Sequence, residues 1–268
     1  MDAPASPLVL TKLRVPAGRA RLIPRTRLVD RLVPQPGVGL ILVCAPAGYG
    51  KTTLLCEWAQ TLQRDQVAVA WYALDPSDDD PIPFGAYLTA SLIQALGPLP
   101  GLSQTTQLLR ASPEVELARI LPRVINAVAA CDKSCVLVLD DYHLIASPAI
   151  HSALAYLLDH LPENLHIAIG SRSDPPLPLA RLRARGQLQE IRTAGLRFDA
   201  GETAKFLIDA MQLELPADSV ATLAARTEGW AAGLQLAALS LTGLPEPERT
   251  IASFSGSHRY MVEYLLEE

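Results

Sequence analysis

Aromatic residues are scarce in this sequence, where Phe, Trp and Tyr make up only 5% of 268 residues. A folded core must therefore be built mainly from Leu, Ala, Val and Ile, and Trp58, Trp71 and Trp230 are most simply core residues. Charged residues reach only 19% while hydrophobic residues reach 49%, which excludes the intrinsically disordered class. At roughly 150 residues per domain, the length suggests one large domain or two smaller ones.

Positive charge and long apolar runs are also lacking. Lys and Arg number 23 against 28 Asp and Glu, so the net charge of −5 excludes bulk attraction to nucleic acid and leaves only a local basic patch open. The longest apolar run, at residues 37–48, is broken by Gly and Pro and falls short of the ~18 residues that a membrane helix needs. The N-terminus lacks the pattern of a signal peptide.

Only four cysteines are present. Cys44 and Cys56 lie in apolar contexts typical of buried, reduced thiols. Cys131 and Cys135 form a C-x3-C pair without the further ligands that a zinc site requires. These shortages predict a cytoplasmic protein with no membrane contact and no disulfide framework.

Apolar, β-branched runs alternate with helical patterns over much of the chain. Strands are predicted at residues 39–45, 67–74, 135–141, 165–171 and 187–193, and helices at 51–64, 84–96, 113–130 and 148–160. A connector rich in Gly, Pro and Ser is expected between the second and third of these helices. This alternation predicts an α/β fold, a five-stranded parallel sheet flanked by helices.

After about Leu196 the pattern becomes entirely helical. Asp199 and Asp218 are expected N-caps, and Glu202 completes a capping box with Asp199. The sequence therefore predicts a small all-helical subdomain after the sheet.

The strongest chemical signal is APAGYGKTT at residues 45–53, between a predicted strand and a predicted helix. This is the context of the Walker A motif, although Ala45 replaces its usual first Gly. Gly48 and Gly50 allow backbone N–H groups to converge on phosphate oxygens, and the helix N-terminus adds its own N–H groups.

Side chains of the same segment extend this prediction. Lys51 is expected to reach the β- and γ-phosphates, Thr52 to ligate Mg²⁺ and Thr53 to touch the α-phosphate. The predicted ATP or ADP contacts in the loop are Ala47, Gly48, Tyr49, Gly50, Lys51, Thr52 and Thr53.

A second signal is VLVLDD at residues 136–141, because a buried strand that ends in carboxylates must have a use for them. Asp140 is the expected Mg²⁺ partner, and Asp141 is placed to orient or deprotonate the attacking water. Many fast ATPases carry the longer Glu at the second position, so the sequence predicts slow hydrolysis. Lys51, Asp141 and Arg172 are the predicted catalytic residues.

Arg172 enters through the expected strand order. We expect the strand at 165–171 to lie between the strand at 39–45, which precedes the phosphate-binding loop, and the strand at 135–141, which ends in the two acids. Its end would then point at the γ-phosphate. Arg172 follows that strand and is a candidate γ-phosphate sensor.

Taken together, these motifs resemble the N-terminal nucleotide-binding region of MalT-type, LuxR-family transcriptional activators, which are STAND-class P-loop NTPases. The resemblance runs from about Leu8 to the C-terminus. It is carried by IPRTRLVDRL (23–32), CAPAGYGKTTLL (44–55), VAWYALD (69–75), VLVLDDYHLI (136–145), IGSRSDPPLPLARLRARGQL (169–188) and TEGWAAGLQLAALSL (227–241).

The resemblance implies a switch that binds ATP or ADP with Mg²⁺, is a weak ATPase, and self-associates in the ATP- and inducer-bound state, the inducer being unknown. DNA would be contacted only through a C-terminal domain absent from this chain. It also implies that Arg25 lies near the adenine. Gln235 occupies the position at which the family's plant and animal members have a Pro that touches the base. The His that senses the β-phosphate in relatives has no counterpart in this sequence.

We accordingly expect four parts: a lead-in at 1–38 with the adenine-side motif and a short helix near 26–33, a P-loop NTPase domain at 39–196, a helical subdomain at 197–256, and the start of a truncated winged-helix region at 257–268. The alternative function is a turnover AAA+-like ATPase, a loader or remodeller. Such an enzyme should carry Glu after Asp140 and a second sensor Arg, for which Arg226 is the obvious candidate. A small-molecule kinase is disfavoured because no phosphoacceptor pocket is recognisable.

Three weaker features stay open. His143 either touches the site or is a surface or capping residue. Arg181, Arg183 and Arg185 suggest an arginine finger or a DNA contact, but a solvated charge run is favoured because their spacing does not share one helical face. The acidic loop at 75–80 is expected to be solvated rather than to hold a metal.

Overall fold

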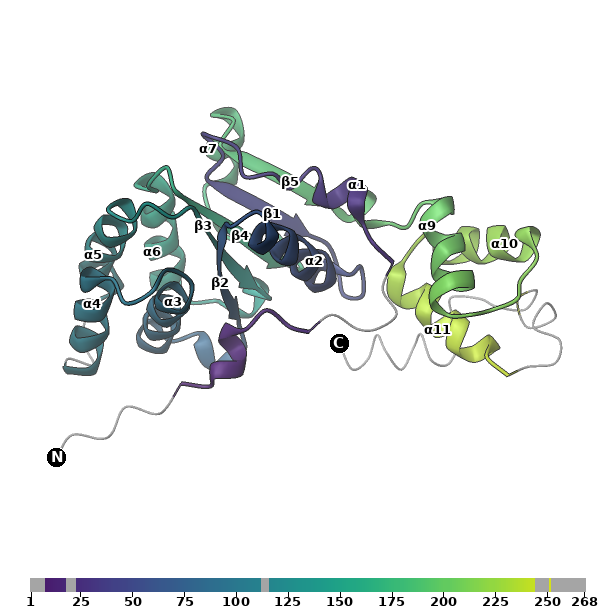
Figure 1. The fold of residues 1–268 in the computed structure, drawn as a ribbon, viewed down its shortest axis with the longest axis horizontal. Coiled ribbons are helices and arrows are strands. Elements are labelled where there is room, and N and C mark those ends of the chain that lie inside the picture. Colours follow the sequence, from purple (N-terminus) through teal and green to yellow (C-terminus); the bar gives the residue numbers. More distant parts are fainter. Residues whose placement is uncertain (1–7, 18–22, 112–115, 244–250, 252–268) are drawn as a thin grey trace. The chain divides into compact units, whose positions relative to one another are not determined.

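The computed structural model describes residues 8–17, 23–111, 116–243 and 251 (Figure 1). By contacts the chain divides into two compact units that interleave along the sequence. The first, which we call the sheet unit, comprises Met1–Pro16, Leu32–Cys44 and Trp58–Ile191. The second, the phosphate-loop unit, comprises Ala17–Arg31, Ala45–Glu57 and Arg192–Glu268. The expected boundary between residues 196 and 197 stays a prediction.

A five-stranded parallel sheet forms the centre of the first unit. Its order is β2 (Ala68–Ala73), β3 (Cys135–Asp140), β4 (Leu165–Ser171), β1 (Leu40–Cys44) and β5 (Leu188–Arg192). All residues of β1, β3 and β4 are buried, as expected for strands covered on both faces. The predicted insertion of β4 between β1 and β3 is confirmed by the parallel pairings on its two sides.

The helices of this unit include α3 (Pro81–Leu96), α4 (Pro100–Ala111), α5 (Leu117–Ala129), α6 (Pro148–Asp159) and α7 (Leu179–Ala184). Figure 1 shows α3 to α6 clustered together. The prediction of a connector rich in Gly, Pro and Ser after α3 is wrong, because helix α4 occupies these residues. Pro100 and Gly101 lie in the first turn, where a helix tolerates them, and Leu102 and Leu109 give α4 a buried side.

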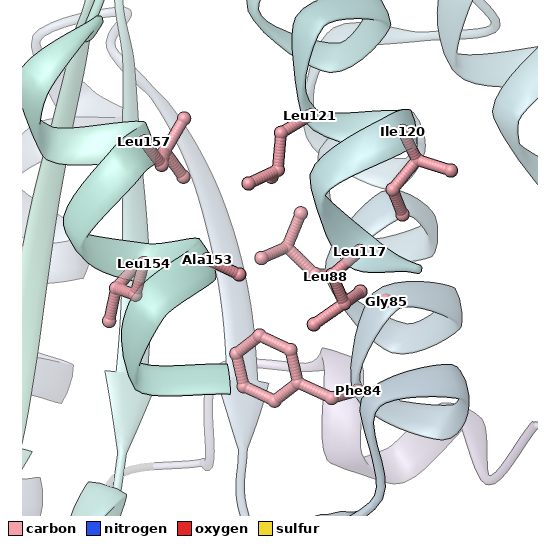
Figure 2. Close-up of a pocket in the computed structure, with 9 residues that line it drawn as sticks. All are labelled: Phe84, Gly85, Leu88, Leu117, Ile120, Leu121, Ala153, Leu154 and Leu157. Atoms are coloured by element: carbon pink, nitrogen blue, oxygen red, sulfur yellow. The ribbon is translucent and has the colours of Figure 1, made fainter. Parts of the chain in front are cut away.

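A small apolar cavity lies among α3, α5 and α6 (Figure 2). A Cβ atom at Gly85 would lie 2.7 Å from Leu117 Cδ2, so the glycine permits the close approach of α3 and α5. The nine lining residues are all apolar and form part of the helical packing: Phe84, Gly85, Leu88, Leu117, Ile120, Leu121, Ala153, Leu154 and Leu157.

The acidic loop after β2 differs from the solvated loop that we expected. Asp78 is fully buried, and its carboxylate accepts hydrogen bonds from Lys12 Nζ at 2.5 Å and from the Asp75 backbone at 2.8 Å. Lys12 comes from the short helix η1 (Leu10–Leu13). Asp79 accepts two backbone N–H groups at the start of α6, and Asp80 caps α3. The carboxylates of Asp78, Asp79 and Asp80 therefore fix the conformation of the loop through hydrogen bonds.

The phosphate-loop unit is made of helical segments, of which η4, α10 and α11 contribute most to a smaller apolar cluster around Leu207, Leu223 and Leu234. The segments are α1 (Thr26–Val29), the start of α2 (Lys51–Arg64), α8 (Thr193–Leu196), α9 (Ala200–Lys205), a π-helical turn η4 (Phe206–Ala210), α10 (Ala217–Thr227) and α11 (Ala231–Leu241).

Of the two capping predictions for this unit, one is confirmed and one is wrong. The capping box of Asp199 and Glu202 is confirmed at the start of α9. The prediction for Asp218 is wrong, because Pro216 is the N-cap of α10. Asp218 lies in the first turn, where its charge still complements the helix dipole. The predicted winged-helix start at residues 257–268 lies outside the described residues.

Two further observations concern the whole described chain. The four cysteines are free thiols. Within the described ranges, no helix has both the length and the apolar character needed to cross a bilayer.

Candidate nucleotide-binding site

The segment at 45–50 leaves β1 and turns into α2, which begins at Lys51. Gly48 and Gly50 have φ angles of +75° and +77°, the left-handed region that favours glycine. Lys51 is only 7% exposed, and its Nζ donates to the carbonyl of Pro46 at 3.0 Å. The loop thus has the backbone conformation that lets N–H groups gather around an anion.

The same loop is held by the start of α11. Trp230 Nε1 donates to the Ala47 carbonyl at 3.0 Å, and the Ala232 N–H donates to the Gly48 carbonyl at 2.9 Å. A Cβ atom at Gly48 would lie 2.6 Å from Ala232 Cβ and 2.7 Å from Trp230 Nε1. Glycine is therefore required at position 48 for this packing as well as for its φ angle.

Arg25 is buried within the phosphate-loop unit, with 5% of its surface exposed. Its guanidinium donates to Glu202 at 3.0 Å and to the Leu196 carbonyl at 2.9 Å, and it lies 4.5 Å from the centre of the Phe198 ring. Burial lowers the pKa of Arg25, and the Glu202 carboxylate opposes this effect. The guanidinium therefore binds residues 196–202 of the same unit, and the adenine contact implied by the resemblance stays a prediction.

Glu57 ties the lead-in segment to α2. Both of its carboxylate oxygens accept the Arg25 backbone N–H, at 2.9 and 3.0 Å. Burial raises the pKa of Glu57, while this hydrogen bond lowers it. The sequence interpretation missed Glu57 and treated Trp230 as a core residue, whereas Trp230 is partly exposed and bonds to the loop. Neither contact leaves a local pattern, because the partners lie 32 and 183 residues apart.

The predicted acids lie at the end of β3 in the sheet unit. Asp140 is 2% exposed, and its carboxylate accepts the Asp141 backbone N–H at 3.1 Å. Asp141 has a φ angle of +60°, which is uncommon for a residue other than glycine, and its side chain is 42% exposed. His143 Nδ1 lies 3.9 Å from Asp141 Oδ1, so the two residues form a loose pair.

Arg172 directly follows β4, the strand between β1 and β3. Parallel strands end at the same edge of a sheet, so Asp140 at the end of β3 and Arg172 after β4 lie at the same edge of the sheet unit. Ser171 is fully buried, and its hydroxyl donates to the Ser173 carbonyl at 2.6 Å. The sensor role of Arg172 remains a prediction.

The side chains at the predicted Mg²⁺ positions, Thr52 in the phosphate-loop unit and Asp140 in the sheet unit, are each of a chemical type that suits a magnesium nucleotide, and their joint binding of one ion stays a prediction. Among the described residues, no group of three or more His, Cys, Asp and Glu side chains could hold a metal ion by itself. Mg²⁺ in nucleotide sites takes one or two protein oxygens together with phosphate and water. The Thr52 hydroxyl and the Asp140 carboxylate are ligands of that kind.

In the cluster of Arg181, Arg183 and Arg185, the first two are paired on the surface. Arg181 donates to Asp159 at 2.5 Å, and Arg183 makes a two-fold contact with Glu190 at 2.8 Å. These pairs fit the favoured interpretation of a solvated charge run.

Comparison with known proteins gives the family. A model of the AAA ATPase domain matches residues 17–169, more than half of the chain. The serine/threonine-protein kinase PknK of Mycobacterium tuberculosis is 35% identical over 98% of this chain. The transcriptional regulator MalT of Yersinia enterocolitica is 34% identical over 97% of it. The chain spans 24% and 28% of these relatives, about a quarter of their length.

Solved structures agree on the fold alone. Cdc6p of Pyrobaculum aerophilum matches with a TM-score of 0.54 at 16% identity, over 91% of this chain and 67% of that protein. The Aeropyrum pernix ORC1 protein in complex with DNA matches with a TM-score of 0.50 at 16% identity, over 89% and 65%. The resemblance to the NTPase region of MalT-type regulators is confirmed, and the chain belongs to the family of AAA ATPase domains.

Proposed function

We propose that this chain is the ATP/ADP switch module of a MalT-like regulator of transcription. The observation that carries the proposal is the loop at 45–50, with both glycines in the left-handed region, between the buried strand β1 and helix α2. The similarity to MalT and to PknK along nearly the whole chain supports a signalling role. We further propose a cytoplasmic protein that self-associates in its ATP state and contacts DNA through another part of a longer chain.

The proposed chemistry assigns each group one role. Lys51 and the loop N–H groups hold the phosphates, and bound Mg²⁺ would neutralise charge on the β- and γ-phosphate oxygens. Asp141 orients a water, whose oxygen bonds to the γ-phosphorus as the bond to the β–γ bridging oxygen breaks. The products are ADP and phosphate, and the water's proton passes through Asp141 to solvent.

Hydrolysis by this group should be slow. The exposed Asp141 carboxylate is accessible to water, but it is one methylene shorter than a Glu. Slow cleavage suits a switch, because ATP then persists long enough to hold one state. A turnover AAA+-like ATPase is the second candidate, and the similar solved structures of Cdc6p and ORC1 share only the fold with this chain.

Nucleotide retention and turnover separate the two functions. We expect single-turnover cleavage followed by tight retention of ADP. Steady-state turnover well above ~1 per second, in the range of working enzymes, would contradict the switch. Asp141→Glu should raise the rate of the cleavage step, and Asp141→Asn should lower it, while the affinity for ATP stays within a factor of about three.

A further inference from the structure

Three consecutive carbonyl groups of the phosphate loop are each held by a hydrogen bond. The Pro46 carbonyl accepts Lys51 Nζ, the Ala47 carbonyl accepts Trp230 Nε1, and the Gly48 carbonyl accepts the Ala232 N–H. Lys51 belongs to the loop itself, but Trp230 and Ala232 come from the start of α11, more than 180 residues away in sequence.

The geometry of the peptide bond turns these contacts into a direction for the loop N–H groups. A trans peptide is planar, so its C=O and the N–H of the next residue point in opposite directions. Fixing the Ala47 carbonyl on the Trp230 indole therefore aims the Gly48 N–H away from Trp230. Fixing the Gly48 carbonyl on α11 likewise aims the Tyr49 N–H away from that helix.

The bond to Gly48 also satisfies α11. The first N–H groups of a helix have no partner within it, and the Gly48 carbonyl supplies one to Ala232. The loop and the helix start thus complete each other's hydrogen bonds.

The indole ring of Trp230 is confined on two sides. A Cβ atom at Gly48 would lie 2.7 Å from its Nε1, and one at Gly233 would lie 2.6 Å from its Cε3. Gly229, just before it, has a φ angle of +70° and accepts the Phe198 backbone N–H at 2.8 Å. The ring position is therefore set by its neighbours.

We infer that Trp230 is a positioning residue for phosphate binding: its indole N–H holds the Ala47 carbonyl and thereby keeps the Gly48 N–H directed toward the phosphates of a nucleotide, beside the Tyr49 N–H that the Ala232 contact directs. This inference rests on the proposed nucleotide function. Because coupling is reciprocal, a bound polyphosphate also strengthens the contact between the loop and α11. The helical region then senses nucleotide through the loop backbone.

The decisive comparison is Trp230→Phe against Trp71→Phe in the whole 268-residue sequence. Phe keeps most of the ring packing and removes the N–H donor, while Trp71 is a buried residue of β2 that lies outside the loop. Tripolyphosphate is the main probe because it tests phosphate contacts without the base, and ATP is the second. We expect Trp230→Phe to weaken both about three- to tenfold, the size of one hydrogen bond, and Trp71→Phe to leave both unchanged.

Gly233→Ala provides an independent test with the tryptophan retained. The new Cβ atom must displace the indole, so we expect a loss of thermal stability without ligand, partly offset by the helix preference of alanine, and binding is compared below the unfolding transition. We expect the same weakening of tripolyphosphate. If Trp230→Phe fails to fold, Gly233→Ala alone decides the question.

Two outcomes overturn the inference: wild-type affinity for tripolyphosphate in a folded Trp230→Phe variant, or wild-type affinity in Gly233→Ala. Either result would leave Trp230 as a packing residue only. If the wild-type chain itself binds neither tripolyphosphate nor ATP, the proposed function fails instead, so the two failures are distinguishable.

Discussion

The sheet unit and the phosphate-loop unit are held together in different ways. In the sheet unit, β1, β3 and β4 are buried along their whole length, and alternate residues of each contribute to one large apolar core. In the phosphate-loop unit, single polar contacts join residues far apart in sequence, such as Arg25 with Leu196 and Trp230 with Ala47. The unit that carries the loop therefore depends on a few contacts that one substitution can remove.

Each unit also contains the kind of contact that dominates in the other. The phosphate-loop unit has its own small apolar cluster around Leu223, and the sheet unit buries the ion pair of Lys12 and Asp78. The difference is one of placement. In the phosphate-loop unit the polar contacts lie beside the loop, whereas in the sheet unit the pair of Lys12 and Asp78 lies under the acidic loop after β2. Loss of these contacts should therefore have different consequences for ligand binding.

The largest expected effect is a cavity in the sheet. Leu137 lies at the middle of β3 and has no exposed surface, so Leu137→Ala should destabilise the protein by about 2–5 kcal/mol. Denaturant unfolding measures this loss, and Leu239→Ala, at a side chain that is 55% exposed, is the control. Similar losses for both variants would contradict the claim that the core lies in the sheet.

Lys51→Ala tests the loop without a core cavity. Removing a charge-assisted contact to phosphate should weaken ATP about 100-fold, as measured by calorimetric titration. Lys133→Ala, at an exposed lysine just before β3, changes the net charge equally and should leave the affinity unchanged. Retention of ATP affinity in the Lys51 variant would remove the loop from the binding site.

Arg25→Met tests the polar contacts of the phosphate-loop unit. Removing the guanidinium leaves Glu202, whose side chain is 11% exposed, without one partner and the Leu196 carbonyl without its donor, which should cost about 2–3 kcal/mol. Hydrogen exchange should rise in α9 and α11 more than in β3 and β4. The control is Arg185→Met, at an exposed arginine after α7. A uniform rise across both units would show that they unfold as one.

Local patterns predicted what local interactions determine. The buried strands, the two glycines of the loop and the Asp199 capping box follow from neighbouring residues, and all are found. Helix α4 was missed because its Pro and Gly suggested a connector, whereas packing of Leu102 and Leu109 decides the matter. The bonds of Trp230 could not be predicted, since hydrogen bonding across 183 residues leaves no periodic signal.

The burial of Asp78 was missed for a related reason. A run of acids predicts a solvated loop, but Lys12, 66 residues earlier, supplies the opposite charge beneath it. Cation–π contact with the Tyr87 ring, 4.5 Å from Lys12 Nζ, further fixes the ammonium.

The smallest expected effect is a dependence on pH in the sheet unit. Burial alone would lower the pKa of Lys12, but the carboxylates of Asp78 and Asp75 outweigh it and raise this pKa above 10.5. The native state therefore holds the proton more tightly than the unfolded chain does. The resulting stabilisation is complete below pH 10.5 and is lost as the pH rises through the raised pKa.

Lys12→Arg isolates this contribution, because arginine stays charged throughout that range. Between pH 9 and 11.5 we expect the wild-type free energy of unfolding to fall by about 0.5–1 kcal/mol more than that of the variant. Urea unfolding at several pH values measures the two slopes, and the other tyrosines and lysines cancel in their difference. Parallel slopes would mean that Lys12 loses its proton equally in both states, and the ion pair with Asp78 would then contribute nothing to the stability of the sheet unit.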